Sequence, residues 1–392
     1  MYYSELTSTQ RDLQRRARAL ADSELGPRAR QWDETSAFPE TSYTALGREG
    51  LLGLTVPASY GGTGQGVLEA CLVLEEVARG CLASAMALQM NVNGPSRVIS
   101  TLGTEEQRRW LLPGAADGSR YFAVAMTEPD AGSDGLGLTT RLERRDGRWF
   151  LTGTKCYITG GVRADTFLVF CRLAGTSGAR GIGAVIVESS AAGFHCAVTE
   201  QKMGGRGVPE ATLTFEDVEI TDVQIVVPPD AETKNGAAIL IQQFNPERCG
   251  NAAMSIGVAR AAFEEALRHC KSREQFGRRL IEFQGLQWKL ADMAVDLEAS
   301  ERLLRTACRS SDEHGFPELL PTAMAKLHAN EMVQRVTNTA IQLLGHKGYS
   351  TDSPVERYFR DGRGLGLAGG TTEVLRNLIA AGVAGERFSQ RA

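Results

Sequence analysis

Residues 362–377 read GRGLGLAGGTTEVLRN, and Gly364, Gly366 and Gly369 among them have the G-x-G-x-x-G spacing of a dinucleotide-binding turn. Such a turn follows a β-strand, begins a helix, and is completed by a second strand with an acidic residue about twenty positions on. The preceding segment, SPVERYFRDGR, is charged and has no β-branched apolar run, and too few residues follow Gly369. The stretch therefore predicts a tight turn at the start of a helix and argues against a Rossmann fold.

The composition is that of an ordinary globular protein. The chain has 392 residues, 42% hydrophobic and 23% charged, with a net charge of −4. This balance excludes a strongly cationic chain, so we expect no nucleic-acid partner. We find no apolar run long enough for a bilayer and no targeting segment, which favours a cytoplasmic protein without membrane contact. The eight cysteines form no C-x-x-C pair and the five histidines no H-E-x-x-H motif, so no metal site is expected.

The pattern of residues changes twice along the chain. Residues 1–120 indicate helices, with capping boxes expected at Thr7 and at Thr104. Residues 121–233 contain short β-branched and aromatic runs between glycine-rich turns, namely YFAVAMTE, RWFLTGTKCYIT, TFLVFCRL, IGAVIVES and ATLTFEDVEI. Residues 234–392 return to a helical period. We predict an α+β protein with an N-terminal helical domain, a central β-barrel or sandwich, and a C-terminal four-helix bundle.

Two segments of the β region have side chains suited to a flat polar ligand. AMTEPDAGSD, residues 125–134, places Thr127 and Ser133 around a turn, where hydroxyls and backbone N–H groups can converge. KCYITGG, residues 155–161, places Tyr157 and Thr159 on one face of a strand, so that a ring can cover a cofactor while a hydroxyl bonds its rim. Each segment alone is equally typical of an ordinary hairpin.

Together with three later segments, these motifs resemble the acyl-CoA dehydrogenase family over nearly the whole chain. The later segments are SREQFGRRLIEFQGLQ, QLLGHKGYSTDSPVERYFRDGR and GGTTEVLRNLIA. The resemblance implies bound FAD and oxidation of an acyl thioester between Cα and Cβ, in which a base removes the α-proton and flavin N5 accepts the β-hydride. It also implies a homotetramer or homodimer and an electron acceptor such as electron-transfer flavoprotein.

The resemblance assigns cofactor contacts residue by residue. The residues expected to line FAD within one subunit are Met126, Thr127, Gly132, Ser133, Tyr157, Thr159, Gly370, Thr371, Thr372 and Glu373. Those expected to complete the FAD site of a neighbouring subunit are Arg273, Gln275, Phe276, Gln284, Gln342 and Gly345. A planar guanidinium such as that of Arg273 can pair with two phosphate oxygens, although a solvated arginine at a helix end is the plainer interpretation.

This chain lacks the catalytic base at the position where many members of the family carry it. They carry a glutamate at the position of Gly369, whereas some branches place the base on the first long helix of the C-terminal domain, before an arginine. Glu247, followed by Arg248, matches the second pattern and is the predicted base. Alternatively, Asn245 is an N-cap, Pro246 the first helical residue, and Glu247 only favours the helix dipole. In an apolar pocket the pKa of Glu247 would be raised.

The predicted substrate contacts are those of Ser133, of Asn245 with the pantetheine arm, and of Arg248 at the thioester channel. Whether the thioester is on coenzyme A or a carrier protein stays open. The chain departs from residues common in the family at two positions: His346 replaces a glycine, and Gly160 replaces an asparagine. Both changes affect expected cofactor contacts. A flavin monooxygenase or N-hydroxylase on the same fold, which needs no α-proton base, and a non-catalytic flavoprotein are the alternative functions.

Overall fold

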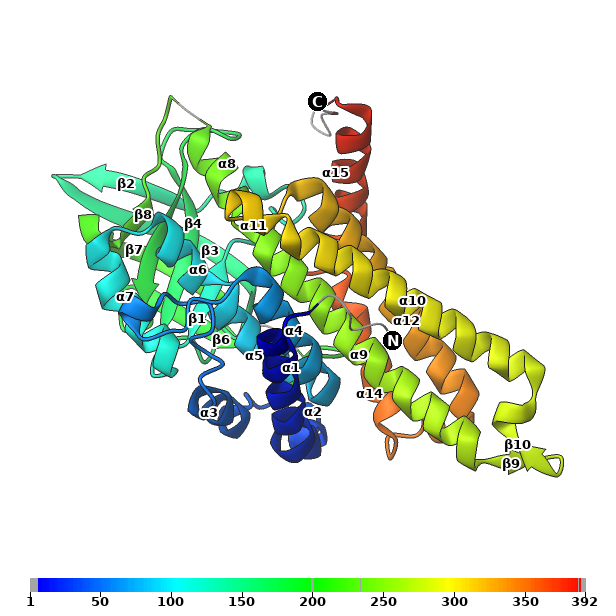
Figure 1. The fold of residues 1–392 in the computed structure, drawn as a ribbon. Coiled ribbons are helices and arrows are strands. Elements are labelled where there is room, and N and C mark those ends of the chain that lie inside the picture. Colours follow the sequence, from blue (N-terminus) through cyan, green and yellow to red (C-terminus); the bar gives the residue numbers. More distant parts are fainter. Residues whose placement is uncertain (1–5, 199–200, 233, 387, 389–392) are drawn as a thin grey trace.

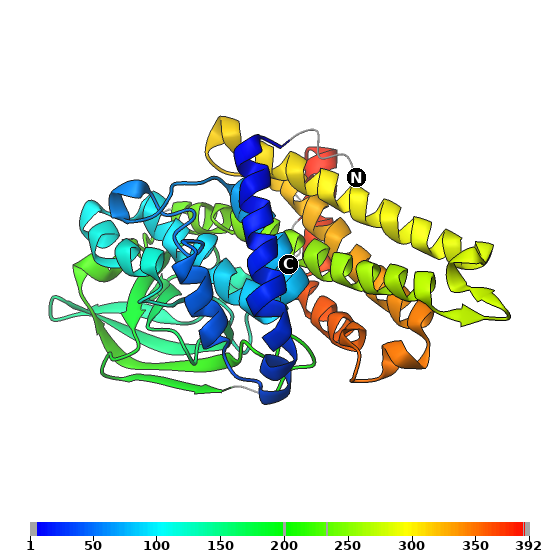
Figure 2. The ribbon, with the colours of Figure 1, turned by 60° about the horizontal axis from the view of Figure 1, so that its bottom comes forward.

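The computed structural model describes residues 6–198, 201–232, 234–386 and 388. In Figure 1 the strands gather on one side, the long helices α9, α10 and α12 extend to the other, and the first helices lie where the two meet. Figure 2 shows α1 crossing this junction. The predicted order of a helical, a β and a second helical domain is thereby confirmed. Among the described residues, no helix is long and apolar enough to cross a membrane.

The N-terminal domain is helical, as its capping signals predict. Both expected capping boxes form: the side chain of Thr7 accepts from Gln10 N, and that of Thr104 accepts from Gln107 N. The α-helices are α1 Ser8–Leu20, α2 Ala29–Thr35, α3 Glu40–Arg48, α4 Val67–Gly80, α5 Leu82–Val92, α6 Pro95–Leu102 and α7 Glu105–Asp117. Short π or 3₁₀ turns lie at Ala21–Leu25, Gly26–Arg28 and Ala58–Tyr60 here, and at Gly135–Gly137, Asp222–Gln224 and Leu280–Glu282 later in the chain.

The middle domain is one eight-stranded sheet in the order β6-β7-β3-β2-β4-β5-β8, with β1 paired to β4. Its strands are β1 Phe122–Ala125, β2 Arg141–Arg145, β3 Arg148–Thr159, β4 Thr166–Leu173, β5 Ile182–Glu188, β6 Phe194–Val198, β7 Glu210–Ile220 and β8 Ile225–Val227. The five predicted runs all form strands. The sequence patterns missed β2, which is mostly charged, β6, which is mostly exposed, and β8, which is three residues long.

The C-terminal domain is a helical bundle built on α9, which packs against α10, α12 and α14 and also against α4 of the first domain. Its helices are α8 Asn235–Gln242, α9 Phe244–Ser272, α10 Gln284–Arg309, α11 Ser311–His314, α12 Leu319–Leu344, α13 His346–Tyr349, α14 Pro354–Leu365 and α15 Thr372–Ala384. A two-stranded hairpin, β9 Glu274–Gln275 and β10 Arg278–Arg279, joins α9 to α10 at the tip of the bundle (Figure 1).

Buried charges join the two helical domains. The Arg260 guanidinium on α9 donates to Glu75 at 3.2 Å and Glu76 at 3.3 Å on α4, and to Glu301 at 2.6 Å on α10. One turn earlier, a Cβ at Gly257 would lie 2.2 Å from the Glu75 carbonyl oxygen, so the two helix backbones approach too closely for any side chain there. This packing fixes the position of α9 and therefore that of the residues at its two ends.

The glycine-rich stretch at residues 362–377 follows helix α14, not a strand. Gly369 and Gly370 have φ of +66° and +97°, values that glycine adopts readily and other residues rarely. Thr371 then caps α15, its hydroxyl accepting from Val374 N at 3.3 Å. The predicted tight turn at a helix start is confirmed, and Glu373 lies in the first turn of that helix, as expected.

Candidate functional site

Strand β3 bulges at Tyr157. Its pairing with β7 shifts register between Lys155 and Ile158, Tyr157 has φ of +56°, and 53% of this residue is exposed. A bulge re-aims the side chain that it carries, and a non-glycine residue at positive φ costs on the order of 1–3 kcal/mol, which the surrounding structure must offset. Cys156 N donates to Thr127 O at 3.0 Å, so the predicted segments 125–134 and 155–161 lie side by side.

A buried ion pair lies beneath this bulge. Lys155 Nζ donates to Met126 O and to Glu128 Oε1, both at 2.8 Å, while Thr139 N and Thr140 N donate to the same carboxylate at 2.6 and 2.9 Å. Burial acts to raise the pKa of Glu128, but Lys155 and the hydrogen bonds outweigh it and lower that pKa to about 2. This pair, which no sequence motif predicted, fixes the backbone of Met126 beside the bulge.

The other predicted residues of this segment differ in exposure. Gly132 and Ser133 are exposed, and Thr159 is half-buried. Gly160, where an asparagine is frequent in the family, has φ of +68°, and a Cβ there would lie 2.6 Å from the Tyr121 hydroxyl. The departure at this position is therefore explained by close packing against a buried tyrosine.

The carboxylate of Glu247 lies directly over Gly369. A Cβ built on Gly369 would be 2.5 Å from Glu247 Oε2 and 3.1 Å from Oε1. Glu247 Oε2 is buried and has no hydrogen-bond partner. The helix α9 glutamate thus takes up the space in which a side chain at position 369 would begin, and it keeps one oxygen free for a proton.

The start of α9 differs from the alternative interpretation of the sequence. Helix α9 begins at Phe244 and its N-cap is Gln243, so the interpretation of Asn245 as the N-cap is wrong. Instead Asn245 Nδ2 donates to Pro317 O at 2.9 Å, and its Oδ1 accepts from Arg248 Nη1 at 2.9 Å. The predicted pantetheine contact of Asn245 stays a prediction, and it requires one of these bonds to be exchanged.

Two cations lie near the Glu247 carboxylate. Burial raises the pKa of Glu247, while Lys326 and Arg248 act to lower it. Lys326 is fully buried; its Nζ donates to Gly370 O at 2.9 Å and to Asn330 Oδ1 at 3.0 Å, and burial lowers its pKa to about 8. Lys326 was not among the predicted site residues, although a lone lysine between apolar and small residues in AMAKLHAN is a signal of a buried charge.

Arg248 joins the two elements of the site. Its Nε donates to Gly369 O at 3.3 Å, and the side chain is buried. With Lys326 bonded to Gly370 O, cations hold two successive carbonyls of the turn beneath Glu247. The turn is therefore positioned by the same side chains that favour the ionised carboxylate.

A second group of predicted residues lies at the opposite end of α9. The members at the β9–β10 hairpin, Arg273, Gln275, Phe276 and Gln284, are exposed, and so are Gln342 and Gly345 where α12 ends. His269 lies close to both regions: burial lowers its pKa, and nearby Lys347 and Arg273 lower it further. Arg273 is 26 residues beyond Glu247, which is about 39 Å along a helix.

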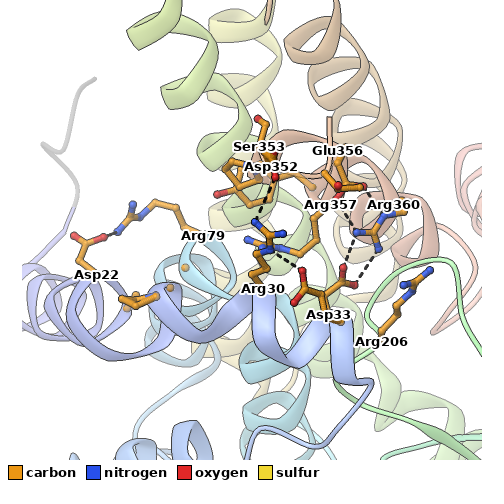
Figure 3. Close-up of a pocket in the computed structure, with 18 residues that line it drawn as sticks. Asp22, Arg30, Asp33, Arg79, Arg206, Asp352, Ser353, Glu356, Arg357 and Arg360 are labelled. Atoms are coloured by element: carbon orange, nitrogen blue, oxygen red, sulfur yellow. Dashed lines mark hydrogen bonds and ion pairs between the residues drawn. The ribbon is translucent and has the colours of Figure 1, made fainter. Parts of the chain in front are cut away.

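A surface cavity of about 690 Å³ between α2 and α14 contains none of the predicted site residues (Figure 3). Its charged side chains pair with one another: Arg360 donates to both oxygens of Asp33, at 2.9 and 2.6 Å, and Arg79 pairs with Asp22. None of the residues that line this cavity has a buried carboxylate oxygen without a hydrogen-bond partner, as Glu247 has. Among the described residues, no cluster of histidine, cysteine, aspartate or glutamate could hold a metal ion.

Comparisons with known proteins agree with the order of the three domains. Family models described as the N-terminal, middle and C-terminal domains of acyl-CoA dehydrogenase match residues 7–119, 123–218 and 234–384. The chain is 38% identical to a 3-sulfinopropanoyl-CoA desulfinase of Variovorax paradoxus, over 98% of this chain and 97% of that protein. It is 35% identical to a short-chain specific acyl-CoA dehydrogenase of Clostridium acetobutylicum, over 96% and 98%. Butyryl-CoA dehydrogenase from Megasphaera elsdenii superposes with a TM-score of 0.93 at 31% identity, over 98% and 100%.

Gly369→Ala is predicted to destabilise the protein by about 1–3 kcal/mol, because alanine is strained at positive φ and its Cβ meets the Glu247 carboxylate. Part of this loss should disappear in a Glu247→Ala background, since the steric conflict is then absent. Thermal unfolding of the four proteins of this cycle measures the coupling. Gly364→Ala, in α14 with open space around it, is the control and should be neutral or slightly stabilising. Strictly additive losses would contradict the contact.

Proposed function

The chain belongs to the acyl-CoA dehydrogenase family, and we propose that it oxidises an acyl thioester between Cα and Cβ with Glu247 as the base that removes the α-proton. The observation that carries this proposal is the buried, unpartnered Oε2 of Glu247 above Gly369. A buried carboxylate oxygen without a donor is costly, and it is the arrangement that a general base needs before substrate arrives.

FAD is the cofactor of this enzyme class, and the residues present fit a flat flavin. Tyr157 is held outward by a strained bulge, Thr159 lies two residues further along the same strand, and Gly369 and Gly370 leave the turn beneath Glu247 without side chains. FAD, when bound, accepts the hydride that leaves the β-carbon. The contacts proposed for Met126, Thr127, Gly132 and Ser133 follow from the adjacency of the two segments.

The chain's own residues supply the proton chemistry. As the proton passes to the Glu247 carboxylate, the Cα–H electron pair forms the new Cα=Cβ bond, and the β-hydrogen leaves as hydride with both electrons of the Cβ–H bond. Burial raises the pKa of Glu247, the direction that a general base needs, and the nearby charges of Lys326 and Arg248 oppose that rise. Thr371, Thr372 and Glu373, at the start of α15, are proposed to place the helix N-terminus beside the cofactor.

We further propose that a neighbouring copy of the chain completes the FAD site. A dinucleotide is shorter than the roughly 39 Å of helix between Glu247 and Arg273. The exposed group of Arg273, Gln275, Phe276 and Gln284, with Gln342 and Gly345, therefore serves the FAD of another subunit in a homodimer or homotetramer. Phe276 is 93% exposed in the single chain, as expected of a residue that a partner covers.

The proposal extends to the electron acceptor, the thioester carrier and the fate of the substrate. Electron-transfer flavoprotein is the proposed acceptor, and the thioester is on coenzyme A or on a carrier protein.

A desulfinase is a second candidate, because the relative from Variovorax paradoxus is named for that activity. We favour dehydrogenation, since a free carboxylate beside the acyl Cα and Cβ repels the sulfinate on which a desulfinase acts. A monooxygenase or N-hydroxylase would instead need a reductant and oxygen, and a non-catalytic flavoprotein would not be reduced by any acyl thioester.

Glu247→Gln is predicted to keep FAD and lose flavin reduction by acyl-CoA, by roughly 10²- to 10⁴-fold. Anaerobic stopped-flow bleaching of the flavin across a panel of acyl-CoAs measures the rate. The control is Glu106→Gln, an exposed carboxylate on α7 outside the proposed site, which should be reduced normally. Normal reduction of Glu247→Gln would refute the assignment. If the flavin is reduced only by a reduced nicotinamide cofactor and oxygen is then consumed, the protein is a monooxygenase. Release of sulfite from 3-sulfinopropanoyl-CoA would indicate a desulfinase.

Lys326→Met should shift the acid limb of the kcat/KM–pH profile to higher pH. The base works deprotonated, so activity rises with pH through the pKa of Glu247, and removing a nearby positive charge raises that pKa further. Rates of flavin reduction between pH 5 and pH 9 would report the shift, with FAD content measured in parallel. Lys234→Met, an exposed lysine before α8 to which no role is assigned, is the control. An unmoved or lowered acid limb would be inconsistent with this role.

Arg273→Ala should weaken FAD retention on gel filtration, by about tenfold or more in affinity, because a pyrophosphate loses its bidentate partner. Arg268→Ala, an exposed arginine one turn earlier that pairs with Glu265, is the control. Co-expression of Arg273→Ala with Glu247→Gln chains tests where Arg273 acts. Mixed oligomers should regain activity, since an intact Glu247 then meets an intact Arg273 of the neighbour. No recovery in mixed oligomers would place Arg273 outside a shared site.

A further inference from the structure

Helix α6 lies beside the first turn of α9. Thr101 Oγ1, near the end of α6, donates to Oε1 of Gln243, the N-cap of α9, at 3.0 Å. Arg97 is four residues before Thr101 and therefore on the same face of α6. Its guanidinium thus points toward the helix that carries Glu247.

Arg97 is half-buried, and two of its guanidinium nitrogens are buried without a counter-ion. Its Nε and Nη2 atoms have no hydrogen-bond partner, and no carboxylate of the described residues pairs with it. The groups around it are the buried thiols of Cys71, Cys249 and Cys308, and burial lowers the pKa of Arg97. Arginine stays charged in proteins, so Arg97 cannot avoid the cost of burial by losing its proton.

Arg260 is a buried arginine with a structural role, and its partners can be compared with those of Arg97. It also lies in the helical core, but it contacts three carboxylates, those of Glu75, Glu76 and Glu301. An unpaired buried charge is strongly destabilising, whereas a paired one can be neutral. Packing alone therefore does not account for Arg97.

A chain of hydrogen bonds leads from the base toward Arg97. Gln89 Nε2 donates to Glu247 O at 2.9 Å, and Gln89 Oε1 accepts from Asn93 Nδ2 at 3.1 Å. Asn93 ends α5, just before α6 begins, and its Oδ1 is a further buried oxygen without a partner. The path begins at the residue whose carboxylate has an unpartnered oxygen, Glu247, and ends at Asn93, four residues before Arg97 in the chain.

We propose that Arg97 binds a second, anionic group at the far end of the acyl chain, so that the substrates are acyl thioesters ending in a carboxylate. The inference rests on the proposed function: with Cα at Glu247, the acyl tail extends along α5 and α6 toward Arg97. A guanidinium pairs with a carboxylate through two parallel N–H donors, which supplies the missing partners of Nε and Nη2. Uncharged thiols offer no competing anion at neutral pH, and a neutral tail would leave Arg97 unpaired.

The test uses the FAD-loaded enzyme and thioester pairs of equal length that differ only at the tail. Glutaryl-CoA is compared with pentanoyl-CoA and adipyl-CoA with hexanoyl-CoA, by anaerobic flavin bleaching. The carboxylated member should be preferred by about 10²-fold in kcat/KM in at least one pair, and Arg97→Met should abolish or invert this preference. Arg109→Met, an exposed arginine on α7, is the control and should leave it unchanged. 3-Sulfinopropanoyl-CoA shows whether a shorter sulfinate tail is taken instead, which would overturn the carboxylate assignment.

Thermal unfolding gives a readout independent of turnover. Arg97→Met should raise the melting temperature of the ligand-free enzyme, because an unpaired buried charge is removed, and it should lose the stabilisation that glutaryl- or adipyl-CoA gives the unaltered enzyme. A lower melting temperature would show that Arg97 serves the fold, and equal rates for charged and neutral tails in both proteins would refute the inference while leaving the proposed function intact. If no thioester reduces the flavin, the proposed function fails, and the ligand-induced stabilisation alone decides for or against an anion site at Arg97.

Discussion

The site depends on one steric constraint: the Glu247 carboxylate and a side chain at position 369 cannot occupy the same space. With glycine at 369, the carboxylate from α9 lies over the turn, and the positive φ of Gly369 and Gly370 lets that turn approach it. Arg248 and Lys326 bind the two glycine carbonyls from either side. The position of the carboxylate, the shape of the turn and the pKa of Glu247 are therefore set by one small group of contacts.

Much of the architecture could be predicted because its signals are local. Both capping boxes, five strands and the turn before α15 follow from patterns spanning fewer than about twelve residues. The N-cap interpretation of Asn245 failed because α8 runs almost directly into α9, and the asparagine bonds Pro317 and Arg248 instead. The Glu128–Lys155 pair and the position of Lys326 beside Glu247 could not be predicted, since the partners are distant in sequence and a single sequence does not show which buried charges meet.

The buried charges of this chain divide by their partners. Arg260 pairs with three carboxylates and Lys155 with one, and they position α9 and the Tyr157 bulge, respectively. Glu247 and Arg97 each have buried side-chain atoms without a hydrogen-bond partner. Interiors seldom leave such atoms unpaired without a reason, and here both flank the same few turns of α5, α6 and α9. The difference between the two groups lies in ion pairing: Arg260 also has an unpartnered Nε, but its guanidinium pairs with three carboxylates.

Helix α9 runs uninterrupted from Phe244 to Ser272, with the proposed base near one end and the proposed contact to a neighbour's cofactor just beyond the other. Each residue of an α-helix turns the chain by about 100° and advances it by about 1.5 Å. A single-residue insertion or deletion between positions 247 and 273 would therefore rotate one end out of its site while the other stayed in place. The helix between these two residues should therefore tolerate substitutions far better than insertions or deletions, because only a change of length alters the distance and the rotation between the two sites.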